Sequence, residues 1–268
     1  MHAEEQYYLG DHTLPTAQSK FEWSDEMVEA YERCKNDITY FAENFFIIIT
    51  AVNGKTKRIP IPLRDYQRKF LDDSMKHKRI LALQSRQSGK STLMTVYALW
   101  LANFFPDQSI IICAHKGDTA RMLFKRIKEA YKELPNWLKE PCTEWNKSSM
   151  TLANGSSIVT SNTTAEGPRG NSLSCLILDE FAFVAPEIAQ QFWTAVAPTL
   201  ANNPDARMFV SSTPNGIGNL FHKLYTDAEE GKNNFAVQRV IWSDVPGRDE
   251  AWKKRTIVDD CFGNIEIF

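Results

Sequence analysis

The sequence has little that would support a disulfide framework, a zinc site or a membrane span. Its 268 residues include only five cysteines, which are widely spaced and form no Cys-x-x-Cys pair, and no histidine stands at zinc-finger spacing. This pattern excludes a disulfide scaffold and a structural zinc, and favours the reduced thiols of a cytoplasmic protein. The apolar run Phe45–Ile49 is far shorter than a membrane-spanning helix. Residues 1–20 are polar and acidic, without the basic and then apolar pattern of a signal peptide.

An excess of positive charge is also absent. Lysine and arginine total 31 and aspartate and glutamate total 33, which gives a formal net charge of −2. Any contact with nucleic acid must therefore use a local patch rather than the field of the whole molecule. The hydrophobic share of 43% and the charged share of 24% are those of a globular protein, so the length allows one large domain or two small ones.

Short apolar segments alternate with longer helical ones along most of the chain. The pattern predicts strands over residues 79–84, 109–114, 175–178, 206–211 and 235–242 and helices over residues 64–74, 90–103 and 118–134. A hairpin is expected around Asn154-Gly155, and Ser24 is expected to begin a helix. Residues 1–22 show no period and are expected to be poorly structured. The alternation indicates an α/β fold, with a mostly parallel sheet flanked by helices and a small N-terminal helical subdomain.

The segment from residue 84 to residue 92 has the form of a phosphate-binding loop. It follows a predicted strand, opens a predicted helix and ends in Gly-Lys-Ser-Thr. Gly89 would let the backbone approach phosphate oxygens, Lys90 would reach the β- and γ-phosphates, and Ser91 would offer a hydroxyl to Mg²⁺. Gln84 replaces the usual first glycine, so the loop is a variant, and an ordinary polar turn is the alternative. The candidate ATP-binding residues here are Gln84, Ser85, Gln87, Ser88, Gly89, Lys90, Ser91 and Thr92.

Two carboxylates, Asp179 and Glu180, end the strand predicted over residues 175–178. In this position the first acid would hold Mg²⁺ together with Ser91, and the second would polarise the attacking water. Ligands of open α/β sheets bind beyond the carboxyl ends of the strands, where both motifs fall. The strand predicted over residues 109–114 stands between the two motifs, as expected for the ATPase class (ASCE) in which an extra strand separates them. The alternative is an acidic cap on a surface loop.

Three further residues can contact a nucleotide. Gln67 has an amide that can read both N6 and N7 of adenine, and Tyr66 can stack on the ring. A helix start with a core tyrosine is the alternative for this pair. Arg86 lies inside the phosphate loop, where it can supply charge to the γ-phosphoryl transition state unless it is simply solvated.

Two loops near the predicted strand ends offer further candidates. Ser212, Thr213, Pro214 and Asn215 can sense the γ-phosphate and carry the change outward, with a simple β-turn as the alternative. Arg169, between two glycines, can be a second phosphate contact, in cis or from a neighbour, or a solvated side chain.

Several cations lie in and just before the helix predicted over residues 118–134. Lys116, Arg121, Lys125, Arg126 and Lys128 can touch a phosphate backbone. The alternative that the sequence favours is a solvated helix face, on which the acids at positions 118, 129 and 133 balance these cations.

Several motifs, in order along the chain, resemble the large terminase subunit of tailed bacteriophages, nearest to the large-myovirus type. The main matches are residues 85–92, Leu178–Phe183 and Ser212–Gly216, and further matches lie at residues 64–67, 114–116, 144–147 and 169–172. The similarity runs from about residue 38 to residue 242.

This resemblance implies the amino-terminal ATPase of a motor that drives double-stranded viral DNA into a procapsid in the host cytoplasm. It implies ATP and Mg²⁺ as ligands, the portal protein and the small terminase subunit as partners, and no membrane. A homo-oligomeric ring, usually a pentamer, is implied on the procapsid, with a monomer in solution as the alternative. Arg86 would be the arginine finger, Glu180 and Lys90 would act in catalysis, and Ser212–Asn215 would couple hydrolysis to movement.

Three parts of the chain are expected. These are an N-terminal helical segment (1–58), the ATPase core (59–245) and an extension (246–268) toward an RNase H-type nuclease that full-length members carry. The chain has no room for that nuclease, so nuclease activity is not expected. One alternative function is a helicase-like DNA-dependent ATPase, which would need two such lobes in one chain, whereas only one phosphate loop is present. The other is a nucleotide-binding DNA-docking module without turnover, against which Glu180 argues.

Overall fold

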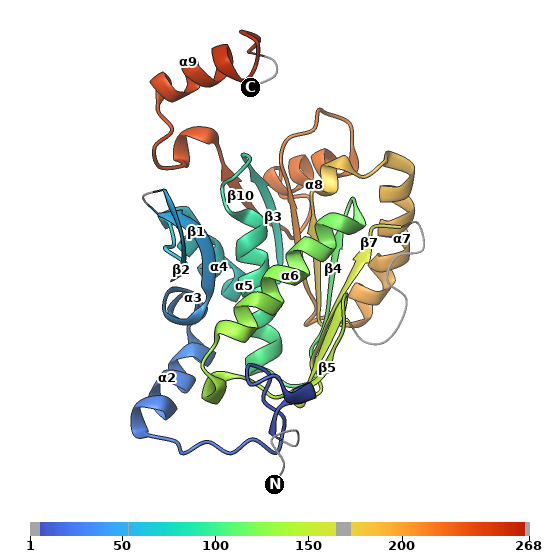
Figure 1. Cartoon of the computed structure of the whole chain (residues 1–268). Coiled ribbons are helices and arrows are strands. Elements are labelled where there is room, and N and C mark those ends of the chain that lie inside the picture. Colours follow the sequence, from blue (N-terminus) through green and yellow to red (C-terminus); the bar gives the residue numbers. More distant parts are fainter. Residues whose placement is uncertain (1–5, 53, 165–172, 266–268) are drawn as a thin grey trace.

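An eight-stranded sheet forms the centre of the molecule (Figure 1), in a computed structural model that describes residues 6–52, 54–164 and 173–265. Its strands are β3 (Arg79–Gln84), β4 (Ser109–Ala114), β5 (Cys142–Trp145), β6 (Ser149–Leu152), β7 (Ser157–Asn162), β8 (Cys175–Asp179), β9 (Arg207–Ser212) and β10 (Ala236–Val240). They lie in the order β10-β3-β9-β8-β4-β7-β6-β5. The strands from β10 to β7 are parallel, whereas β6 and β5 continue the sheet antiparallel. The predicted α/β class is therefore confirmed.

Helices cover both faces of the sheet, because successive side chains of a strand point to opposite sides. The helices are α2 (Asp25–Asn36), α3 (Ile38–Phe45), α4 (Asp65–Lys76), α5 (Lys90–Phe104), α6 (Gly117–Glu133), α7 (Pro186–Asn202), α8 (Leu220–Glu229) and α9 (Glu250–Asp259). Ile177 and Phe209 belong to the core under α2 to α6. Leu176 and Val210, one position away on the same strands, belong to the core under α7 and α8.

The strand that separates the phosphate-loop strand from the acidic-pair strand is β9, not β4. β9 pairs with β3 on one side and with β8 on the other. β4 pairs with the far side of β8. The expectation that residues 109–114 would lie between the two motifs was therefore wrong in position. The order of strands along the chain does not determine their lateral order in a parallel sheet, because each crossover helix can place the next strand on either side.

The N-terminal part packs against α5 and α6 and shares their hydrophobic core. α2 begins after Ser24, whose hydroxyl accepts a hydrogen bond from the backbone of Met27, as predicted. A two-stranded hairpin follows α3, with β1 (Ile47–Val52) antiparallel to β2 (Lys55–Pro60). At the other end of the described chain α9 projects away from the sheet (Figure 1), and none of its residues is buried. No helix among the described residues has both the length and the apolarity needed to cross a membrane.

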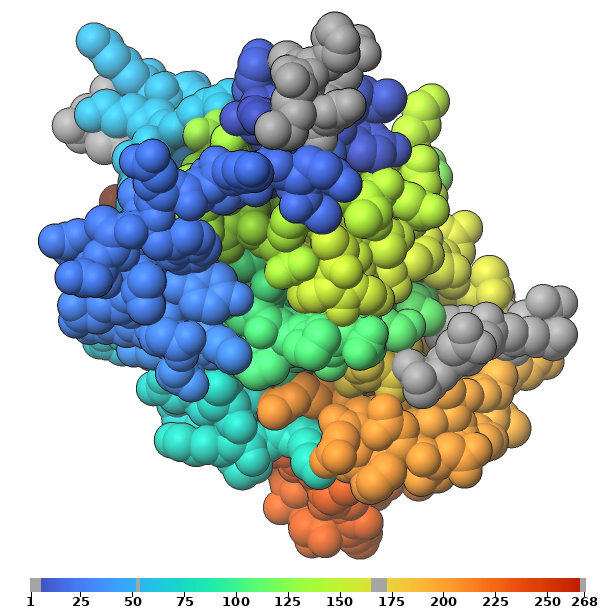
Figure 2. Space-filling model, turned by 90° about the horizontal axis from the view of Figure 1, so that it is seen from below, coloured from blue at the N-terminus to red at the C-terminus, as the bar shows by residue number. Residues whose placement is uncertain are grey.

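Residues 6–16 are packed, contrary to the expectation of a poorly structured N-terminus. Figure 2 shows this segment lying beside the strands at the lower end of the molecule. The Pro15 carbonyl accepts a hydrogen bond from the backbone of Cys142 at 2.9 Å, and the Thr13 carbonyl accepts one from Nζ of Lys139 at 2.8 Å. Leu14 is only 2% exposed. These contacts involve residues more than a hundred positions away in the sequence, so the local pattern of residues 6–16 could not predict that this segment is packed.

Replacing Leu14 by alanine should lower the free energy of unfolding by about 2 kcal/mol, because the deletion leaves a cavity in a buried site. Leu9, which is 89% exposed, provides a matched control in the same segment. Urea denaturation of Leu14→Ala and Leu9→Ala measures the difference. Equal stability of the two variants would contradict the packing of this segment.

Candidate nucleotide site

The phosphate loop joins β3 to α5 through two residues in left-handed backbone conformations. Gly89 has φ of +93° and Gln87 has φ of +58°. α5 begins at Lys90 without any side-chain cap on its first amides. Free amides at a helix start, next to a left-handed turn, form a concave anion-binding surface. This is the local geometry that binding of phosphate oxygens requires.

Tyr66 and Gln67, at the start of α4, hold this loop from outside. The Tyr66 hydroxyl and Nε2 of Gln67 both donate to the Ser88 carbonyl, at 2.8 and 2.9 Å. Oε1 of Gln67 accepts from the backbone of Arg64 at 2.9 Å, and the Arg64 guanidinium donates to the Tyr66 hydroxyl at 2.7 Å. A β-carbon on Gly89 would collide with Nε2 of Gln67. The pair predicted to contact adenine therefore lies directly against the phosphate loop.

Gln84, at the position where a glycine is usual, braces the loop from inside. Its side chain is fully buried, and its Oε1 accepts from the Ser88 hydroxyl at 3.0 Å. Its Nε2 donates to Oε1 of Gln238 on β10 at 3.4 Å, and Gln238 in turn donates to Asp73 at 3.3 Å. A side-chain amide thus links the start of the loop to its end and to the edge strand of the sheet.

We expect Gln84→Gly to restore the usual glycine yet destabilise the protein by about 1–2 kcal/mol. The substitution removes the partner of the buried Ser88 hydroxyl and adds backbone freedom to the unfolded chain. Differential scanning fluorimetry and urea denaturation measure the effect. A stabilised glycine variant would show that Gln84 does not brace the loop.

Asp179 lies next to the loop at the end of β8 and is 2% exposed. Its Oδ2 accepts from the Ser91 hydroxyl at 2.9 Å, and its Oδ1 accepts from the Ser211 hydroxyl at 2.7 Å. Ser211 is on the interposed strand β9, directly before the segment Ser212–Asn215. Placing β9 between β3 and β8 is what brings this second hydroxyl to the carboxylate. Three oxygen-bearing side chains therefore meet where the two motifs face each other.

Glu180 forms an ion pair with the phosphate-loop lysine. Oε1 of Glu180 lies 2.7 Å from Nζ of Lys90, and both side chains are largely buried. Oε2 accepts from the backbone and the hydroxyl of Thr213, at 3.1 and 3.2 Å. Burial raises the pKa of Glu180, but the Lys90 ammonium and the Thr213 hydrogen bonds outweigh burial and hold that pKa below its ordinary value. The carboxylate is therefore ionised at neutral pH and is bonded to the loop after β9.

That loop, Ser212–Asn215, is linked to the chain after Glu180 on its other side as well. The Ser212 hydroxyl accepts from the backbone of Ala182 at 3.2 Å, and the Asn215 amide donates to the Ala182 carbonyl at 2.9 Å. A change in the position of Glu180 would therefore displace this loop through these hydrogen bonds.

The remaining predicted residues make fewer contacts with the site. Arg86 and Gln87 are exposed, and the hydroxyl of Ser85 is buried without a hydrogen-bond partner among the described residues. Thr92 lines a cavity of about 420 Å³ between β1 and α6. Arg169 falls outside the described residues. Arg248 was not predicted: its guanidinium donates to the Arg86 carbonyl at 3.0 Å and lies over the ring of Trp252, and no motif marks it in the sequence.

The fold and the site together define a P-loop NTPase of the ASCE type. Its phosphate loop follows one strand, its acidic pair ends another, and a third strand carrying polar side chains lies between them.

A more specific relationship comes from comparison with known families. The family described as "Terminase large subunit, T4likevirus-type, N-terminal" matches residues 81–259, which is more than half of the chain. The chain therefore belongs to the T4-like family of large terminase subunits, the ATPase motors of phage DNA packaging, and corresponds to the N-terminal part.

Solved structures of phage terminases have a similar fold. The large terminase ATPase domain of Thermus phage P74-26 is 22% identical, with a TM-score of 0.59, and the similarity covers 75% of this chain and 90% of that one. The large terminase of bacteriophage HK97 is 16% identical, with a TM-score of 0.64, over 83% of this chain and 47% of that one. The large terminase of a thermophilic bacteriophage, solved in complex with ADP, is 17% identical, with a TM-score of 0.55, over 73% of this chain and 50% of that one. The chain thus spans about half the length of the last two proteins.

Proposed function

We propose that this chain binds and hydrolyses ATP, and that hydrolysis drives double-stranded DNA into a procapsid. The observation that carries the proposal is the position of Glu180, held between Lys90 of the phosphate loop and Thr213 of the loop after β9. The Glu180 carboxylate thus contacts both Lys90, which would bind the γ-phosphate, and the loop Ser212–Asn215, which would move when the γ-phosphate is released. Family membership and the ADP complex of the thermophilic phage terminase support a nucleotide at this site.

ATP would place its phosphates on the amides of the phosphate loop, with the adenine near Tyr66 and Gln67. Bound Mg²⁺ would neutralise charge that develops on the phosphates. Asp179 and Ser91 fit the oxygen ligands that Mg²⁺ prefers, because a buried carboxylate and a hydroxyl already meet at 2.9 Å. Lys90 would leave Glu180 for the β- and γ-phosphates, which frees the carboxylate to align the attacking water. Arg86 would add positive charge from the same loop, and Arg169 would be a second candidate.

Release of the γ-phosphate would return Lys90 to Glu180. Since Thr213 is bonded to that carboxylate, the loop Ser212–Asn215 would shift with it and carry the change to α8. In this proposal the N-terminal segment (1–58) and the extension (246–268) move relative to the ATPase core (59–245). The motor would act in the host cytoplasm as a homo-oligomeric ring on the procapsid, with the portal protein and the small terminase subunit as partners.

Steady-state phosphate release from ATP, with and without Mg²⁺ and linear double-stranded DNA, tests this function. The proposal predicts Mg²⁺-dependent turnover that DNA stimulates. Binding of ATP without hydrolysis under all of these conditions would contradict the proposal and favour a nucleotide-binding DNA-docking module. Turnover that single-stranded DNA stimulates but duplex DNA does not would favour the helicase-like alternative.

A further inference from the structure

A groove along α6 concentrates positive charge in a chain whose net charge is −2. The groove has a volume of about 500 Å³ and lies between α6 and the turn that follows β5. Its lining includes five cations, one tryptophan and a single carboxylate, that of Glu129. The cations are Arg121, Lys125, Lys128, Lys132 and Lys147.

The α6 cations form one straight stripe. Positions 121, 125, 128 and 132 are spaced by four, three and four residues, so their side chains share one face of the helix. The stripe is about 16 Å long, a length of B-form DNA axis over which each strand carries about five phosphates. The side chains of Arg121 and Lys125 are 60% and 76% exposed, and they form surface ion pairs with Asp118 and Glu129. Such exposed pairs are weak, so both cations can exchange these partners for phosphates.

Trp145 lines the groove and lies near two of these lysines, and Lys132 also forms an ion pair with Asp11 at 2.6 Å. Nζ of Lys128 lies 4.5 Å from the centre of the Trp145 ring, and Nζ of Lys132 lies 5.8 Å from it. Lys128 also donates to the Asn146 carbonyl at 2.8 Å. Burial and the neighbouring charge of Lys132 lower the pKa of Lys128, as expected where cations are crowded together.

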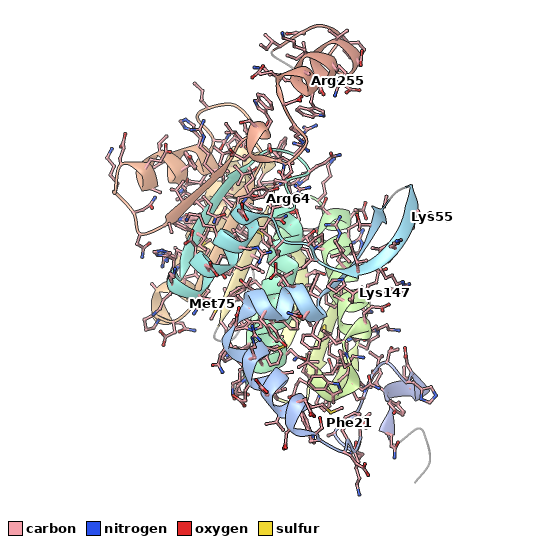
Figure 3. The ribbon with its side chains drawn as sticks, turned by 90° about the vertical axis from the view of Figure 1, so that its left-hand side faces the viewer. Phe21, Lys55, Arg64, Met75, Lys147 and Arg255 are labelled. Atoms are coloured by element: carbon pink, nitrogen blue, oxygen red, sulfur yellow. The ribbon has the colours of Figure 1, made fainter. Side chains whose placement is uncertain are left out.

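Two further cations, Lys55 and Arg58, lie on strand β2 of the β1–β2 hairpin. Lys147 stands beside α6 and Lys55 at the tip of the β1–β2 hairpin, on the same side of the molecule (Figure 3). Arg58 of that hairpin forms an ion pair with Glu133 of α6. At its other end α6 begins just after Ala114, which is paired with Asp179 of the nucleotide site. Asp118, Glu129 and Glu133 each form an ion pair with one cation of the groove or the hairpin, and the cations outnumber these acids.

We propose that this groove, here called the α6 groove, is the surface on which the chain holds the phosphate backbone of double-stranded DNA. The inference rests on the proposed function for the choice of DNA. A long, straight stripe of exposed cations fits a linear polyanion with regular charge spacing. Its lysine and arginine side chains would contact phosphates and would not distinguish one base sequence from another. Binding through a few such contacts is weak and salt-dependent, which suits a motor that must release DNA after each step.

Removal of three exposed groove cations tests this surface. In the triple variant Arg121→Gln, Lys125→Gln, Lys147→Gln, the affinity for a 30-base-pair duplex should fall by about 100-fold at 0.1 M NaCl, and the salt slope should decrease by about 3. Fluorescence anisotropy over a range of NaCl concentrations measures both. The matched control is Lys223→Gln, Lys232→Gln, Arg255→Gln, which removes the same charge from α8, the turn after it and α9. The control should bind DNA within about threefold of the wild type, because long-range charge effects are screened.

The outcomes separate this inference from the proposed function. A groove variant that binds duplex DNA as tightly as the control overturns the α6 groove, whether or not ATP is hydrolysed. Poly-glutamate that binds the wild type in this groove more tightly than DNA does would identify an acidic protein segment as the partner and also overturn it. Loss of DNA affinity with DNA-free ATP hydrolysis unchanged supports it. Failure of the wild type to hydrolyse ATP would instead overturn the proposed function.

Discussion

Replacing Glu180 by glutamine should lower the rate of ATP hydrolysis about 1000-fold, which is the usual contribution of a positioned general base. The amide keeps the size of the side chain and can still accept from Thr213, so the loop after β9 should stay in place. Lys90 loses its ion-pair partner and becomes free for phosphate, so ATP affinity should be unchanged or higher. Single-turnover hydrolysis and equilibrium binding of a fluorescent ATP analogue measure the two effects separately.

The pH dependence of the free energy of unfolding independently tests the ion pair and hydrogen bonds of Glu180. The folded-state pKa of Glu180 lies below its ordinary value of 4.5. The unfolded state therefore binds the proton more readily, and the stabilisation is present above about pH 4.5 and is lost as the pH falls through the lowered pKa. Glu180→Gln should remove that part of the acid dependence, whereas Glu230→Gln, at an exposed carboxylate, should keep it. For the first prediction, an ATP hydrolysis rate in Glu180→Gln equal to that of the wild type would show that Glu180 takes no part in catalysis.

Replacing Gly89 by alanine should damage both the fold and the nucleotide site. A left-handed residue with a β-carbon costs about 1–2 kcal/mol, and the new methyl group would displace Gln67 from the Ser88 carbonyl, at a cost of about 1 kcal/mol. The combined loss of about 2–3 kcal/mol corresponds to about 30- to 150-fold in ATP affinity if the loop must recover this conformation to bind. Calorimetric titration with ATP and urea denaturation measure the two losses.

Gly231 provides the matched control for this substitution. Its φ is +70°, but a β-carbon there meets no atom within 4 Å. Gly231→Ala should therefore show the backbone strain alone and leave ATP affinity unchanged. Equal losses in both variants would mean that the contact between Gly89 and Gln67 contributes nothing to the site.

Local sequence patterns predicted the strands that carry the candidate site. The bounds of β3 and β4 were predicted without error, because a buried parallel strand is a continuous apolar run between polar turns. The segments that resemble a phosphate loop and an acidic pair follow β3 and end β8, as the sequence predicted, because each motif has particular residue types at fixed spacing next to a strand.

Long-range relationships were not predictable in this way. The lateral position of β9 depends on the path of its crossover connection, and the bond between Ser211 and Asp179 follows from that position. Gln84 looked like a missing glycine, because its partner Gln238 lies 154 residues away. The cations of α6 looked like a balanced helix face, since Trp145 and Lys147, which complete the groove, lie on a different element.

The central claim is that this site hydrolyses ATP by means of Glu180, and single-turnover hydrolysis tests it most directly. The wild-type chain, in excess over radiolabelled ATP with Mg²⁺, is quenched at successive times and the released phosphate is counted. The account predicts that all of the bound ATP is converted to ADP and phosphate in one exponential phase, and that Glu180→Gln slows this phase about 1000-fold. Bound ATP that stays intact in the wild type, or an unchanged rate in the variant, would contradict it.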